Sequence, residues 1–133
     1  MAYPEDFDEL VLSDKSDFDS LAPSTRIAYC LHQLEAEVNN GGVYQFFSNS
    51  SGEYVPETLQ ALSDIGAPRT RALLEQAVAI AFPGGYPADP TSFADALADF
   101  DDVADGLEPL DAQFFVYAEP LADLTNHYLA RIT

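Results

Sequence analysis

Carboxylates at helical spacing are the residues of this chain whose pattern most clearly suggests chemistry. Asp95, Asp99 and Asp102 follow an i, i+4, i+7 pattern, and Asp105 extends it. On a helix, side chains three or four positions apart lie about 5–6 Å apart at Cβ, and each i, i+4 pair of like charges costs an isolated helix about 0.2–0.5 kcal/mol. Arg and Lys side chains that bind phosphates also bind carboxylates. The pattern therefore predicts a surface that attracts a cationic partner.

A calcium-binding loop is an alternative for the same segment. Counted from Asp101, Val103 takes the third loop position and Ala112 the twelfth, where an EF-hand requires oxygen ligands. The two His residues of the chain cannot complete the paired Glu-x-x-His motifs of a di-metal helical bundle. A weak cation site on the acidic surface stays open as an alternative, but we predict no dedicated metal site and no cofactor.

Nucleophilic catalysis also lacks a constellation of residues. Cys30 and His32 are two positions apart on a predicted helix, so their side chains point to different faces. We interpret Cys30 as a small buried apolar residue, and a single cysteine excludes an internal disulfide. We therefore predict that the protein is not an enzyme and has no catalytic residues.

The acidic residues are concentrated at the two ends of the sequence. The 133-residue chain has a formal net charge of -18, with seven acids and one Lys in residues 1–22 and ten acids and one Arg in residues 89–133. Such self-repulsion destabilises a compact state, so it needs an explanation in solubility, environment or a cationic partner. Nucleic acid and anionic membranes would meet a surface of like sign. We expect neither as a direct partner, and we expect a basic protein instead.

The length and the apolar periodicity predict a single compact all-α domain of about six to eight helices. Ile27, Leu31, Leu34 and Val38 form one buried stripe behind the helix start at Pro23. The run from Asn39 to Gly42 ends that helix, and a short turn of helix follows over residues 43–47. A second stripe from residue 55 to 65 is closed by Gly66, and Pro68 starts the next helix, over residues 68–82.

The acidic ends are predicted to form flanking helices over residues 1–22 and 89–133. Pro90 opens a helix in which Phe93, Leu97, Phe100, Ala104 and Leu107 share one face, with Asp95, Asp99 and Asp102 opposite. In the last segment, which begins at Leu110, Pro120 breaks the helix. At the other end, Phe7, Leu10 and Val11 fit a short acidic helix. The sequence has neither a targeting segment nor a membrane-length apolar run, so we expect a cytoplasmic protein.

One stretch of the sequence resembles a known family. Residues 34–52 read Leu-Glu-Ala-Glu-Val-Asn-Asn-Gly-Gly-Val-Tyr-Gln-Phe-Phe-Ser-Asn-Ser-Ser-Gly, and residues 62–67 read Leu-Ser-Asp-Ile-Gly-Ala. The string resembles the signature of a bacterial family of small helical proteins whose named member is a DNA-mimic protein of the nineteen-kilodalton type. The family-like core covers about residues 24–82. The resemblance implies an all-α fold, a homodimer, and occupation of the DNA-binding surface of a transcription factor.

Three functional hypotheses follow from the sequence. The first is a DNA mimic that binds a basic DNA-binding protein and competes with DNA. The second is an immunity-type inhibitor of a cationic nuclease or toxin, and the third is a helical protein whose acidity reflects only a high-salt environment. For the first hypothesis, the predicted partner-binding residues are Asp95, Asp99, Asp102, Asp105, Glu5, Asp6, Asp8 and Glu9.

Overall fold

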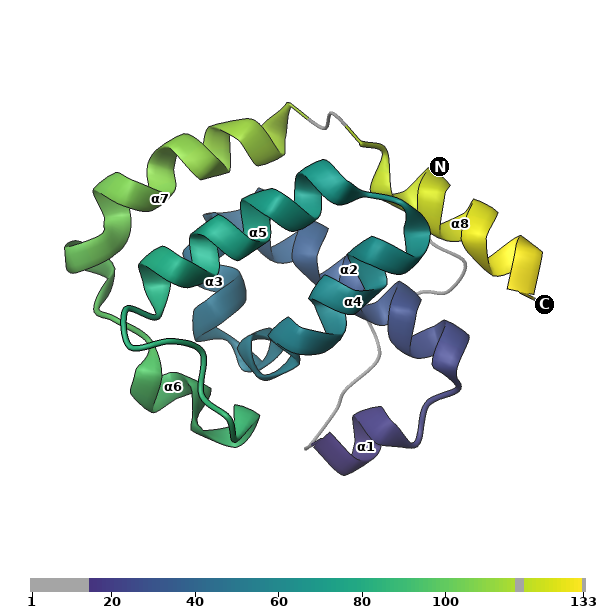
Figure 1. The fold of residues 1–133 in the computed structure, drawn as a ribbon, viewed down its shortest axis with the longest axis horizontal. Helices are drawn as coiled ribbons and strands as arrows, with labels where there is room; N and C mark the ends of the chain where they lie inside the picture. Colours follow the sequence, from purple (N-terminus) through teal and green to yellow (C-terminus); the bar gives the residue numbers. More distant parts are fainter. Residues whose placement is uncertain (1–14, 117–118, 133) are drawn as a thin grey trace.

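The computed structural model describes residues 15–116 and 119–132, and these residues form helices joined by short connections (Figure 1). The architecture is all-α, as predicted, and the described residues contain no strand. The helices are α1 (Lys15–Asp19), α2 (Pro23–Gly41), α3 (Val43–Ser48), η1 (Ser50–Tyr54), α4 (Val55–Ile65), α5 (Pro68–Ala81), η2 (Pro90–Ser92), α6 (Phe93–Ala96), α7 (Phe100–Phe115) and α8 (Leu121–Ile132). The predicted helix around Phe7, Leu10 and Val11 lies outside the described residues.

Proline and glycine determine where the central helices begin and end. Pro23 and Pro68 occupy the first turns of α2 and α5, where a missing amide costs nothing. Gly42 follows α2 with a φ of 85°, and Gly66 follows α4 in the left-handed conformation with a φ of 80°. Both conformations favour glycine because it has no Cβ. The predicted boundaries of these helices are therefore confirmed.

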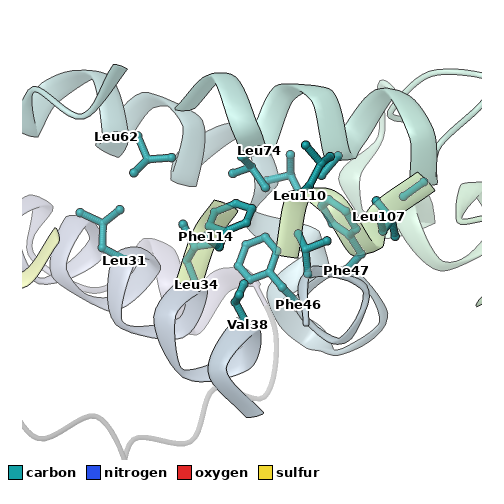
Figure 2. Close-up of a cluster of buried hydrophobic side chains, with 14 of the residues drawn as sticks. Leu31, Leu34, Val38, Phe46, Phe47, Leu62, Leu74, Leu107, Leu110 and Phe114 are labelled. Carbon is teal, nitrogen blue, oxygen red and sulfur yellow. The ribbon is translucent and has the colours of Figure 1, made fainter. Parts of the chain in front are cut away.

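The main core lies where α2, α3, α4, α5 and α7 meet. Figure 2 shows aromatic side chains of α3 between the leucines of the surrounding helices. These side chains are almost completely buried, so they supply most of the hydrophobic stabilisation. The labelled core residues are Leu31, Leu34, Val38, Phe46, Phe47, Leu62, Leu74, Leu107, Leu110 and Phe114.

A second, smaller apolar cluster holds α1 against the body of the protein. Phe18 of α1 stacks on Tyr54 with 4.3 Å between ring centroids, and Tyr29 of α2 contacts both rings. A helix of five residues is unstable alone, so this packing is what orders it. In Figure 1, α1 lies at the lower right, apart from α7 at the upper left.

The C-terminal third of the chain wraps around the central helices. α7 packs against α5 and α3, and α8 packs against α2 and α4. Leu110 and Phe114 belong to α7, so the helix predicted to begin at Leu110 is in fact the end of α7. The predicted break at Pro120 is confirmed, because α8 begins at the next residue.

Candidate functional site

The structure places the predicted partner-binding residues on several elements. Asp95 lies on α6, Asp99 precedes α7 as its N-cap residue, and Asp102 and Asp105 lie on α7. All four are exposed. Glu5, Asp6, Asp8 and Glu9 lie outside the described residues. The predicted single helix through Asp95, Asp99 and Asp102 is therefore wrong, although the four described carboxylates all reach solvent.

Tertiary hydrogen bonds explain the break between α6 and α7. Leu97 and Asp99 have extended backbones, with ψ of 128° and 144°. The amide of Ala98, between them, donates to the carbonyl oxygen of Ala81 at 2.9 Å, and the Tyr44 hydroxyl donates to the carbonyl oxygen of Ala98 at 2.8 Å. These contacts with α5 and α3 satisfy backbone groups that a continuous helix would have paired internally.

The break changes which side chains share a face of α7. Phe100 was predicted to be buried, but it is 53% exposed and meets Tyr44 edge to face at 5.2 Å between ring centroids. The buried side of α7 instead carries Val103, Leu107, Leu110 and Phe114. The opposite side is exposed and carries four carboxylates, which we call the α7 acidic face: Asp101, Asp102, Asp105 and Glu108.

Two members of the α7 acidic face were absent from the predicted site. Asp101, Asp105 and Glu108 follow an i, i+4, i+7 pattern of their own. Asp99 is the residue in the sequence that indicates where this helix begins, because Asp is a favoured N-cap residue. A helix that begins after Asp99 has the acids at 101 and 102 in its first turn, where they are favourable. A helix begun at Asp99 would have identified Asp101 and Glu108.

The charge spacing on α7 is close to that of a nucleic acid strand. From Asp101 to Glu108 is seven residues, or about 10.5 Å of helix axis at about 1.5 Å per residue. Four carboxylates over this length give one negative charge per about 3.5 Å. A strand of duplex DNA carries one phosphate per about 3.4 Å of axis. The α7 acidic face therefore presents to a cationic partner about the same linear density of negative charge as a DNA strand.

These carboxylates are not neutralised within the described part of the chain. The sequence contains no Lys or Arg between Arg71 and Arg131. Among residues 17–116 and 119–132, whose side chains the structure describes, none forms a hydrogen bond or ion pair with the carboxylates of Asp95, Asp99 or the α7 acidic face. Arg71 instead pairs with Glu75 at 3.2 Å, and Arg131 lies over the Tyr128 ring. The charge on α7 remains available to a partner.

Other acids of the C-terminal segment act inside the fold. Asp111 accepts a hydrogen bond from the Val43 amide at 2.8 Å and so caps the first turn of α3. Desolvation raises the pKa of Asp111, although the hydrogen bond from Val43 opposes that shift. Glu119 accepts hydrogen bonds from the amides of Arg69 and Thr70, at 3.1 and 2.6 Å, and from the Thr70 hydroxyl at 2.9 Å. It caps α5 in the same way.

The Asn-Asn-Gly-Gly signature also has a structural role. Glu37 accepts hydrogen bonds from the side-chain amides of Gln45 and Asn49, at 2.8 and 2.6 Å, and so ties α2 to the middle of α3 and to the residue that follows it. A Cβ on Gly42 would lie 2.7 Å from the Asp111 carboxylate oxygen, so only glycine leaves room for that cap. The signature therefore builds the fold and does not contribute to the α7 acidic face.

The described residues offer little for other kinds of site. Within them, no group of three or more His, Cys, Asp or Glu side chains is arranged to hold a metal ion. Cys30 is buried, as predicted. None of the described helices combines the length and apolar character needed to span a bilayer.

Comparison with known proteins identifies the family. The profile of the DMP19-like protein family matches residues 19–132, which include every helix from α2 to α8. Searches of curated proteins and of solved structures found no match to this chain. The family is one of DNA mimics and is not a known enzyme family. Because the family profile matches most of the length of this chain, the chain belongs to the DMP19-like protein family.

Proposed function

We propose that this protein is a DNA mimic that occupies the DNA-binding surface of a basic, transcription-factor-like protein and competes with DNA. The observation that carries the proposal is the α7 acidic face, with four exposed carboxylates at about the phosphate spacing of DNA. Membership of a DNA-mimic family supports the same function. Asp95 and Asp99 extend the proposed surface toward α6, and Glu5, Asp6, Asp8 and Glu9 remain proposed members of it.

The distribution of acids favours a binding surface over a general acidic coat. Ten described acidic residues are exposed, and seven of them lie within residues 89–108. An adaptation to high salt would spread carboxylates over all sides of the protein, because its purpose is hydration of the whole surface. The seven are Asp89, Asp95, Asp99, Asp101, Asp102, Asp105 and Glu108.

The end of α7 adds apolar area that DNA does not present. Phe115 is 50% exposed and Val116 is 73% exposed. Apolar burial is insensitive to moderate salt, whereas the attraction between exposed charges is screened. We therefore expect binding of this protein to its partner to weaken less with salt than binding of DNA to the same partner.

The test is affinity capture from lysate of the source organism with the full chain as bait at low salt, followed by elution with duplex DNA. The proposal expects a basic DNA-binding protein that DNA releases. The variant bait carries Asp101→Asn, Asp102→Asn, Asp105→Asn and Glu108→Gln, and should lose this protein. The control bait loses four charges elsewhere, through Asp17→Asn, Asp19→Asn, Glu75→Gln and Asp123→Asn.

Three outcomes would contradict the proposal. Equal capture by wild type and the α7 variant would exclude the α7 acidic face. Equal loss with both variants would mean that net charge, rather than a surface, holds the partner. Release of a catalytically active nuclease or toxin would favour the immunity-type inhibitor.

Homodimerisation is also a prediction of the family resemblance, and sedimentation of the wild-type chain tests it.

A further inference from the structure

A groove of about 320 Å³ lies between α1, α2 and α4. α2 contributes Arg26, Ile27 and Cys30 to it, and α4 contributes Glu57, Ala61 and Asp64. Cys30 lies three positions after Ile27 and four after Arg26, and Glu57, Ala61 and Asp64 are separated by three, four or seven positions, so the side chains of each helix border the same groove. Two neighbouring helices thus present matching stripes with space between them. The volume of the groove is in the range of ligand-binding pockets.

The groove combines an apolar floor with a mainly acidic rim. Cys30 and Ala61 are each 2% exposed and lie at the floor, with half-buried Ile27 beside them. Glu57 and Asp64 lie along the α4 side. An apolar floor gains free energy from burying an apolar side chain, whereas the rim carboxylates favour cations around it.

α1 also lines the groove. Phe18 is part of the floor and Asp19 part of the rim. The cation of the lining, Arg26, donates from Nη1 to the carbonyl oxygen of Asp19 at 3.3 Å, so it bridges α2 to the end of α1. With three carboxylates and one guanidinium, the lining has a formal charge of -2 (1 − 3).

The spacing of the rim carboxylates indicates what the groove can hold. Glu57 and Asp64 are seven residues apart on α4, or about 10.5 Å along its axis. Cationic residues at i and i+7 of a docked helix have the same separation. Apolar residues between them, at i+3 and i+4, would then face the floor, as in other helix-in-groove complexes.

We propose that this groove docks a cationic amphipathic helix of a protein partner. Apolar anchors enter the floor between α2 and α4, and flanking Arg or Lys residues pair with Glu57 and Asp64. The groove is lined by residues of α1, α2 and α4, and in Figure 1 α1 lies at the opposite side of the molecule from α7. The inference is therefore independent of the DNA-mimic proposal.

The probe for the experiment is a synthetic amphipathic peptide of about 14 residues, or about four helical turns, with Leu at i+3 and i+4 and Arg at i and i+7. It is titrated into the full-length protein labelled with ¹⁵N, and amide shifts are followed. We expect saturable shifts in α1, α2 and α4. Replacing the Leu residues of the peptide with Ser should abolish these shifts.

Matched double variants separate docking from general charge attraction. Glu57→Gln with Asp64→Asn should weaken the affinity of the protein for the peptide by about 2- to 30-fold, which is the range for the loss of two surface ion pairs. Asp101→Asn with Asp105→Asn removes the same charge from α7 and should leave the affinity unchanged. Circular dichroism and urea midpoints check that each variant is folded.

Several results would overturn the inference. These are equal weakening by the two double variants, shifts confined to α7, undiminished binding of the Ser peptide, or no saturation below about 1 mM peptide. Groove shifts that depend on protein concentration without peptide would instead assign the groove to a second copy of the chain.

Discussion

Asp105 is the most crowded carboxylate of α7, and its neutralisation should stabilise the isolated protein. Asp101 lies four residues before it, Asp102 three before it and Glu108 three after it on the same helix. Each such like-charge pair costs about 0.2–0.5 kcal/mol, so three pairs cost about 0.6–1.5 kcal/mol. Asn has nearly the size and helix propensity of Asp. Asp105→Asn should therefore raise the free energy of unfolding by about 0.6–1.5 kcal/mol at low salt.

The assay is urea unfolding followed by circular dichroism, because urea is uncharged. The Debye length falls from about 30 Å at 0.01 M salt to about 3 Å at 1 M, which is shorter than the separation of these charges. The gain should be largest at 0.01 M and should almost vanish at 1 M. With a urea m-value of about 1.5 kcal/mol/M, the midpoint at low salt rises by about 0.4–1.0 M.

Asp95→Asn is the matched control. Asp95 is exposed on the four-residue helix α6, which has no other acidic residue. Its substitution should change the stability by less than about 0.5 kcal/mol. Repulsion within α7 is excluded as the cause if Asp105→Asn is no more stable than Asp95→Asn at 0.01 M, or if its advantage persists at 1 M. A confirmed gain would mean that α7 keeps a charge at the expense of stability, as functional sites often do.

The remaining predictions concern carboxylates and a glycine inside the fold, each checked by urea unfolding. Glu119→Ala leaves the Thr70 amide and hydroxyl without their acceptor and should cost about 2–3 kcal/mol, whereas Glu119→Gln keeps an acceptor and should cost about 1 kcal/mol or less. Equal losses would argue against the cap. Asp111→Ala removes the acceptor for the Val43 amide and should cost about 0.5–2 kcal/mol at pH 7. Because burial raises the pKa of Asp111 in the folded state, its ionisation lowers stability as the pH rises through that raised pKa. Asp111→Asn should thus be at least as stable as wild type at pH 7, with the difference shrinking toward pH 4, and a lower stability at pH 7 would contradict this. Gly42→Ala forces a side chain into a φ of 85° against the Asp111 carboxylate and should cost about 1–3 kcal/mol, so a neutral result would show that the turn relaxes.

Local signals explain why the central helices were predictable. Pro23 and Pro68 mark helix starts, and Gly42 and Gly66 mark helix ends, through conformational preferences that do not depend on distant residues. The apolar stripe of α2 likewise depends on its own sequence. These elements therefore agree with the structure.

The parts that the sequence did not predict depend on distant partners. The extended segment at Ala98 is held by Ala81 and Tyr44, and Tyr44 is 54 residues away in sequence. Asp111 caps α3 from a distance of 68 residues. No local pattern distinguishes such a carboxylate from one that faces solvent. The register error at Asp99 then moved Phe100 to the wrong face and left Asp101 and Glu108 out of the predicted surface.

The hydrogen bonds of Glu37 with Gln45 and Asn49 affect how relatives of this protein can be compared. The conspicuous string is used to join α2 and α3, so relatives could retain it while the outer side of α7 varies freely. Similarity in that string predicts a shared architecture alone. If the α7 acidic face binds the partner as we propose, a shared partner requires similar residues at the positions equivalent to 101, 102, 105 and 108.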